Sequence, residues 1–173
     1  MRVLINGQEW TAAGDIEAWL AARREVVKRI ELDGQEFSGS LEEALTAGGA
    51  AEVRIITVPL QQLLAETKET VKSYLPRLEQ GARKVAYLLQ TGQEEEGFVT
   101  ALQLIDGLGW LVEAVKAIQT LEPEYLPEEN LVSLKEKLEE LLAAWSKGDY
   151  VLVSDLLEYE LAPLLGKWQA HVG

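Results

Sequence analysis

The sequence predicts an α+β protein: a small sheet-forming segment over residues 1–58, followed by an up-down four-helix bundle over residues 59–173. Apolar side chains from Leu60 to Leu88 recur at alternating spacings of four and three, which predicts one buried stripe along a long bundle helix. The preceding segment instead has short runs of alternating polarity, separated by Asn6-Gly7 and Asp33-Gly34. Asn-Gly and Asp-Gly supply the positive φ angles of tight hairpin turns. With 47% hydrophobic residues, both parts have enough apolar side chains for a core.

The segment 1–58 is predicted to repeat the order strand, strand, helix and then to close with one more strand. Residues 5–11 match residues 32–38, and each match is followed by a short helix, capped by Asp15 in the first copy and by Ser40 in the second. The expected strands lie at 3–5, 8–10, 26–32, 35–37 and 53–58.

The resulting order ββαββαβ resembles that of the β-grasp (ubiquitin-like) fold. The diglycine tail of carrier β-grasp proteins is missing, because Val58-Pro59 runs directly into the long helix. The resemblance therefore implies a sheet architecture and not the carrier chemistry.

Four helices are expected after Val58, with Pro59 in the first turn of the first. Pro76 should kink that helix, and Pro163 should bend or split the fourth near Tyr159. Short connections favour an up-down-up-down order. The second helix, about 93–121, is apolar around most of its circumference, which predicts burial on two sides.

Composition and motifs disfavour several classes of function. The formal net charge is −13, so nucleic acid and anionic membranes would be repelled. Cysteine is absent, and His171 is the only histidine, which argues against disulfides, thiol catalysis, zinc, di-iron sites and hydrolase triads. No nucleotide-binding glycine motif occurs. We therefore predict no catalytic residue, cofactor or metal; enzymatic activity is left open but not favoured.

No apolar run reads as a signal peptide or a membrane span, so a cytoplasmic location is expected. The basic cluster of Arg23, Arg24, Lys28 and Arg29 could hold an anion, but a solvated helix end explains it more simply.

The leading hypothesis is a non-catalytic protein-interaction module, such as an adaptor, assembly factor or chaperone-like bundle. Its partner would be another protein or a second copy of the chain in a homodimer. The excess apolar surface of the second helix motivates this hypothesis, with Trp110 as the expected anchor because aromatic side chains dominate binding energy. The predicted interaction residues are Val99, Leu102, Asp106, Trp110 and Glu113.

The alternative is a small-molecule binding protein or an enzyme with a pocket inside the bundle. Such a pocket would lie where prolines and glycines disturb regular helix packing. Its predicted residues are Tyr74, Pro76, Gly81, Gly107 and Gly109.

Overall fold

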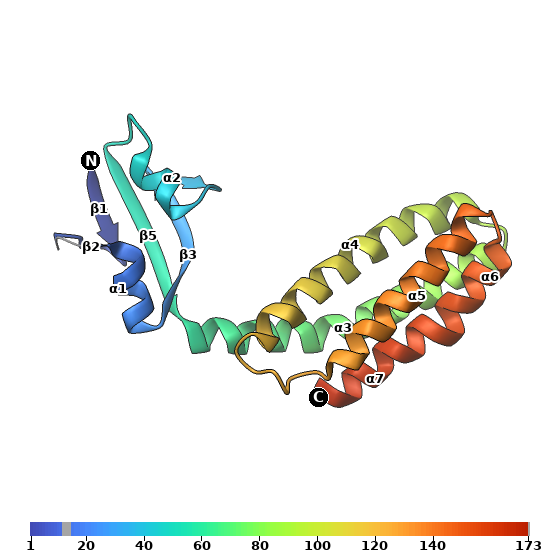
Figure 1. Ribbon diagram of the computed structural model, residues 1–173. Helices are drawn as coiled ribbons and strands as arrows, with labels where there is room; N and C mark the ends of the chain where they lie inside the picture. Colours follow the sequence, from blue (N-terminus) through green and yellow to red (C-terminus); the bar gives the residue numbers. More distant parts are fainter. Residues whose placement is uncertain (12–14, 173) are drawn as a thin grey trace. The chain divides into compact units, whose positions relative to one another are not determined.

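The computed structural model describes residues 1–11 and 15–172, and the chain divides into two compact units, Met1–Ala65 and Glu66–Gly173. Figure 1 shows a sheet with two short helices in the first unit and long helices in the second. The α+β class is confirmed. The division between the units falls within the first turns of the helix that follows the sheet, a few residues beyond the predicted junction after residue 58.

The first unit has the predicted element order ββαββαβ. Its sheet has the order β2-β1-β5-β3-β4, with β1 parallel to β5 and the other neighbours antiparallel. The last strand, β5, therefore occupies the centre of the sheet. The elements are β1 (Arg2–Ile5), β2 (Gln8–Glu9), α1 (Ile16–Arg23), β3 (Glu25–Leu32), β4 (Gln35–Phe37), α2 (Leu41–Thr46) and β5 (Glu52–Pro59).

The two hairpin turns are equivalent positions of the internal repeat, and they make equivalent bonds. Asn6 and Asp33 both adopt φ 49°, each followed by a glycine at positive φ. The side chain of Asn6 accepts the Thr57 N–H at 2.9 Å, and that of Asp33 accepts the Glu52 N–H at 2.8 Å. Each turn residue thus fastens its hairpin to a different end of β5.

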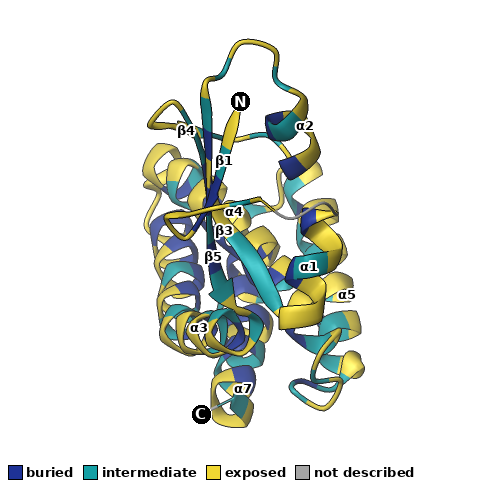
Figure 2. Ribbon diagram, turned by 90° about the vertical axis from the view of Figure 1, so that its left-hand side faces the viewer, coloured by how far each residue is buried: buried dark blue, intermediate teal, exposed yellow. Residues whose placement is uncertain are grey.

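Both short helices pack on the same side of the sheet (Figure 2). Their starts are capped as expected: the Asp15 carboxylate accepts the Glu17 N–H, and Ser40 with Glu43 forms a capping box. The core between helices and sheet is formed by apolar side chains. Its buried members are Ile5, Ile16, Leu20, Ile30, Leu41, Ala44, Val53 and Ile55.

The second unit is an up-down bundle of four helical rods (Figure 1). The first rod begins at Leu60, immediately after Pro59, which pairs with Glu25 as the last residue of β5. The expectation that Pro59 opens the helix is therefore wrong by one residue, because the strand ladder continues through it. The rods are α3 (Leu60–Gln90), α4 (Glu94–Gln119), α5 (Glu128–Ser146), and a fourth made of α6 (Tyr150–Asp155), η1 (Leu156–Leu161) and α7 (Ala162–Val172).

The prolines are accommodated within continuous helices. Pro76 lies inside α3, which continues to Gln90. Pro163 follows the π-helical turn η1, in which the Ala162 N–H donates to the Leu157 carbonyl five residues earlier. The wider π-helical turn accommodates the proline, which has no N–H to donate, and the rod continues without a break.

Candidate interaction groove between α4 and α5

One side of α4 faces the bundle interior and the other does not. Its buried side includes Leu104, Leu108 and Leu111, none more than 5% exposed, whereas Leu102 is 65% and Ile105 is 55% exposed. The second side of this apolar helix is therefore exposed within the described part of the second unit. Figure 2 colours the helices by burial. Exposed apolar surface of this kind marks candidate binding sites.

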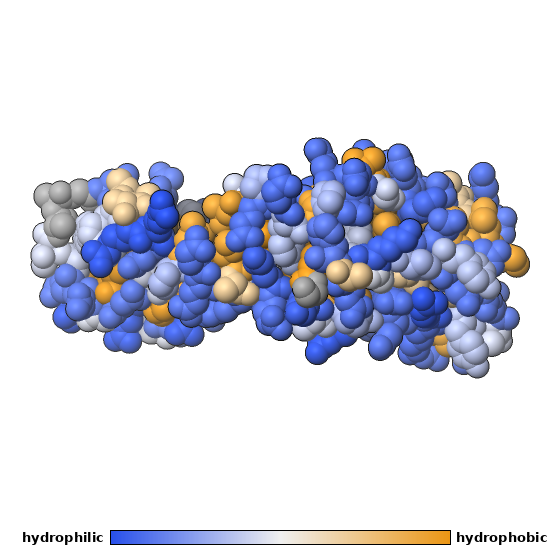
Figure 3. Space-filling model, turned by 90° about the horizontal axis from the view of Figure 1, so that it is seen from below, coloured by the Kyte–Doolittle hydropathy of each residue, from blue (hydrophilic) through white to orange (hydrophobic). Residues whose placement is uncertain are grey.

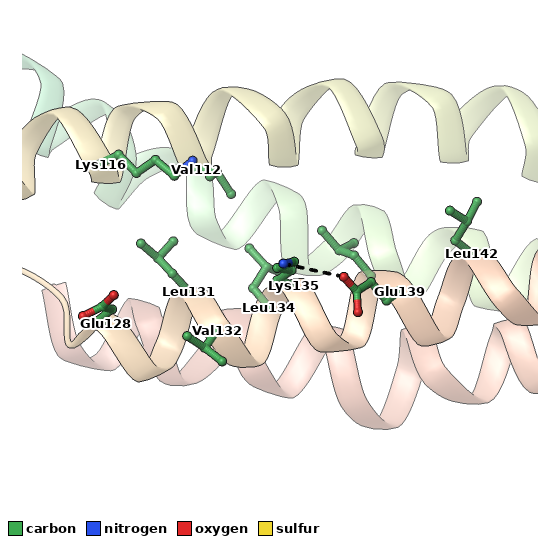
Figure 4. Close-up of a pocket in the computed structure, with 10 residues that line it drawn as sticks. Val112, Lys116, Glu128, Leu131, Val132, Leu134, Lys135, Glu139 and Leu142 are labelled. Carbon is green, nitrogen blue, oxygen red and sulfur yellow. Dashed lines mark ion pairs between the residues drawn. The ribbon is translucent and has the colours of Figure 1, made fainter.

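The uncovered side of α4 forms a groove with α5. Three hollows of about 510, 360 and 270 Å³ adjoin one another, because Leu142, Ile105, Val112 and Leu138 each line two of them. Figure 4 shows the largest hollow, with side chains of α5 below and of α4 above. We call this feature the α4–α5 groove. Its lining includes Phe98, Leu102, Ile105, Gly109, Val112, Glu113 and Lys116 on α4, and Glu128, Leu131, Lys135, Leu138, Glu139, Leu142 and Trp145 on α5.

The groove is long and mostly hydrocarbon. Its α4 side runs from Phe98 to Lys116, about 27 Å at the helical rise of about 1.5 Å per residue. Leu142 is 67% exposed within it. On the face drawn in Figure 3, by contrast, hydrophobic side chains form separate patches among hydrophilic ones.

Aromatic side chains pack together at one end of the groove. The ring of Phe98 lies 5.3 Å from that of Trp145 and 5.4 Å from that of Tyr150, measured between centroids. Trp145 and Tyr150 are 6.1 Å apart and nearly perpendicular. These tilted and edge-on contacts hold the neighbouring ends of α4, α5 and α6 together.

Charged side chains lie only along the edges of the groove. Lys116 pairs with Glu113 at 3.5 Å, and Lys135 pairs with Glu139 at 3.8 Å (Figure 4). Both pairs join residues of the same helix and are exposed to solvent, so each contributes little to stability. Glu128 also lines the largest hollow and makes no ion pair with the described residues.

The five predicted interaction residues lie on the exposed side of α4, but only two line the groove. Leu102 and Glu113 are groove residues. Val99 and Asp106 are exposed beside it. Trp110, the expected anchor, is 42% exposed and packs edge-on against Tyr74 of α3 at 5.2 Å, so part of its surface is already used within the bundle.

The residues of the alternative pocket are not gathered around one of these hollows. A methyl group on Gly107 would lie 2.7 Å from Leu78 Cδ2 and 2.8 Å from the Tyr74 hydroxyl, so the surface of Gly107 is closely covered by α3. A methyl on Gly81 would make an ordinary contact with Leu104. Pro76 is half-buried within α3. Gly109 alone of the five lines the groove. Apart from its chain neighbours and the nearby backbone of its own helix, no described atom lies within 4 Å of the position that a Cβ would take.

Sequence reasoning missed the α5 side of the groove. Leu131, Leu138 and Trp145 follow a heptad, which favours core positions for them, but all three are only partly buried. Leu142 lies one residue outside that heptad, and its position could have indicated the α5 side of the groove. An exposed leucine beside a heptad stripe widens the apolar face toward a neighbour.

The other candidate residues lie in ordinary surroundings. In the basic cluster, Arg23 pairs with Glu25 and Arg29 pairs with Glu31. Within residues 1–11 and 15–172, no group of three acidic or histidine side chains is arranged to hold a metal. The pKa of Lys137 is raised, chiefly by its hydrogen bond to Glu140 and further by Glu160 on the fourth rod.

The loop between α4 and α5 contains a buried hydroxyl. Tyr125 has no hydrogen-bond partner for this hydroxyl among the described residues. Lys68 of α3 lies 5.4 Å from the ring centroid and pairs with Glu122 at 2.8 Å. Burial raises the pKa of Tyr125, and the Glu122 carboxylate raises it further.

Among the described helices, α4 alone is long and apolar enough to cross a membrane by length and composition, and 39% of its most apolar stretch is buried in the bundle. This corrects the expectation that no apolar run reaches that length. The two-sided apolar surface that creates the groove accounts for the high hydropathy.

Comparison with known proteins places the second unit in a family. A family model described as Domain of unknown function (DUF8042) matches residues 66–171. No curated protein and no solved structure matches the chain. The matched region contains α4, α5 and every residue of the groove. Since the match extends over more than half of the sequence, the protein belongs to the DUF8042 family.

Proposed function

We propose that this protein is a non-catalytic interaction module whose α4–α5 groove binds one amphipathic helix of a partner protein. The observation that carries the proposal is the continuity of the groove: three adjoining apolar hollows follow the two helices for about 27 Å. Ionisable side chains lie at its edges and not on its floor. Such a surface favours apolar docking over catalysis.

The shape of the groove favours a helix as the occupant. A furrow between two neighbouring helices accepts the side-chain ridges of a third helix lying along it. A groove of this length corresponds to about 18 residues, or five turns, of such a helix. Apolar side chains every three or four residues would then enter the successive hollows, as in other helix-in-groove complexes.

The same shape argues against a second copy of the chain as the occupant. Two identical faces related by a two-fold axis would place groove opposite groove, leaving hollow space between them. Each copy also carries a formal net charge of −13, so association would bring like charges together. A partner that supplies a convex helix, and not a second concave face, fits the groove better.

A selection experiment on the full-length protein tests the proposal. A displayed library of 18-residue helix-forming peptides is selected against the protein, and the enriched peptides are synthesised and titrated by fluorescence anisotropy. We expect enriched sequences to share apolar residues at positions i, i+3 or i+4, and i+7. Losing one buried leucine contact, worth about 2 kcal/mol, should weaken binding about 30-fold in the Leu142→Glu variant.

Val151→Glu is the matched control. Val151 is 74% exposed on α6 and lines none of the three groove hollows, so the same new charge there should leave affinity unchanged. Selected peptides that bind Leu142→Glu as well as the wild type would overturn the proposal. So would a library that yields no binder, or a dimer in sedimentation equilibrium that Leu142→Glu dissociates and Val151→Glu does not.

A further inference from the structure

We propose that the helix received by the α4–α5 groove is basic along its flanks, with lysine or arginine on both sides of its apolar stripe. This inference rests on the proposed function and adds the chemical class of the partner. Its basis is the charge of the groove edges, which is independent of the apolar floor.

Carboxylates outnumber cations along the groove. Three acidic residues, Glu113, Glu128 and Glu139, line the hollows together with two lysines, Lys116 and Lys135. Each lysine is held by a glutamate of its own helix, so the two ion pairs leave Glu128 as the unbalanced charge at the groove edge.

The edge formed by α4 is also acidic beyond the lining residues. Asp106 precedes Glu113 by seven residues, which places both on one line of the helix surface. Glu95 precedes Asp106 by eleven residues, three further helical turns along that line. Both are exposed, and neither makes an ion pair with another described residue. The α4 edge thus has three carboxylates: Asp106 and Glu113 beside the groove, and Glu95 about one helical turn beyond its Phe98 end. Lys116 neutralises Glu113.

These charges have a consequence for any helix that lies between the two edges. The side chains on either flank of its apolar stripe would approach Glu95 and Asp106 on one side and Glu128 on the other. Lysine or arginine there would gain attraction at each carboxylate, whereas glutamate would be repelled. The net charge of −13 on the whole chain adds longer-range attraction for the same cationic helix, which added salt would screen.

The test uses three synthetic helices with one apolar stripe and different flanks: lysine, glutamine or glutamate at the same positions. Their dissociation constants are measured with the full-length protein between low and high salt. With three unbalanced carboxylates contributing modestly each, the lysine peptide should bind about 10-fold more tightly than the glutamine peptide at low salt, and the glutamate peptide more weakly than either. The three affinities should converge as salt increases.

A charge-neutralised protein connects the preference to these residues. The triple variant Glu95→Gln, Asp106→Asn, Glu128→Gln should reduce the lysine preference to about two-fold while leaving the glutamine peptide unaffected. The control triple variant Glu17→Gln, Glu36→Gln, Asp155→Asn removes the same charge from exposed residues outside the groove. It should retain most of the preference.

The outcomes separate this inference from the proposed function. Equal affinities for the three peptides, with binding still abolished by Leu142→Glu, would overturn the basic-flank inference and leave the docking groove intact. Tighter binding of the glutamate peptide, or an equal loss of preference in both triple variants, would also overturn the inference. Failure of all three peptides to bind would overturn both.

Discussion

Replacing Gly107 by alanine should destabilise the bundle, although alanine is the better helix former. The new methyl group would lie 2.7 Å from Leu78 Cδ2 and 2.8 Å from the Tyr74 hydroxyl, against an optimum of about 3.5–4.0 Å between carbon atoms. Neither neighbour can retreat easily. Leu78 is 4% exposed, and the Tyr74 ring is held edge-on against Trp110.

The magnitude follows from two opposing terms. Overpacking of this kind costs about 1–3 kcal/mol, whereas the helix propensity gained by replacing glycine with alanine is about 1 kcal/mol. We expect Gly107→Ala to lower the free energy of unfolding by about 1 kcal/mol. Gly109, two residues away, has open space where its methyl group would lie, so Gly109→Ala should raise that free energy by about 1 kcal/mol.

Urea unfolding followed by circular dichroism at 222 nm measures the difference between the two variants. A gap of about 2 kcal/mol corresponds to a midpoint separation of about 1 M urea at a typical slope. Equal stabilisation by both substitutions would refute the assignment of Gly107 to a close helix crossing. It would also reopen the alternative that Gly107 borders a pocket, because a methyl group facing an empty pocket adds no clash.

The remaining predictions concern the side-chain hydrogen bonds of the two hairpin turns and the buried hydroxyl of Tyr125. Asn6→Gly and Asp33→Gly both keep a residue that adopts positive φ, but they remove the side-chain hydrogen bonds to β5. Each substitution should lower the free energy of unfolding by about 1–2 kcal/mol. Hydrogen exchange should become faster at the Thr57 amide in Asn6→Gly and at the Glu52 amide in Asp33→Gly. Faster exchange at both amides in either variant would contradict the separate fastening of the two hairpins. Tyr125→Phe removes a buried hydroxyl without a partner among the described residues, so thermal stability at neutral pH should stay the same or rise. Because the pKa of Tyr125 is raised in the folded state, the unfolded chain loses this proton first as the pH passes 10, and stability should fall with pH more steeply in the wild type than in Tyr125→Phe. Identical pH dependence above 10 in the two proteins would contradict the raised pKa.

Much of the architecture was predictable from local signals. Asn6-Gly7 and Asp33-Gly34 specify their turns by backbone sterics, and Ser40 with Glu43 specifies a helix start by hydrogen bonding. These features depend on neighbouring residues only. For that reason the order ββαββαβ was accessible from the sequence. The excess apolar surface of α4 was accessible too, although the sequence predicts burial on two sides and one side is exposed within the described structure.

The groove itself depends on the spacing between two helices, which no local pattern contains. Gly107 and Gly109 look alike in the sequence, yet one is covered by α3 and the other opens into the groove. Trp110 was the natural candidate for an anchor, but only the fold reveals that it packs against Tyr74. The local helix geometry before Pro163 was likewise not predictable, because either a kink or a π-helical turn can accommodate a residue that lacks an N–H donor.

The central position of β5 has a consequence for the order of events during synthesis. The hairpins β1–β2 and β3–β4 involve neighbouring residues and can form within microseconds once each has left the ribosome. The strand that joins them is the last of the five to be made, and its pairing with β1 spans about fifty residues. The five-stranded sheet therefore cannot form before β5 is available, and β5 ends at Pro59, where the long helix begins. Until then, only the two separate hairpins can form.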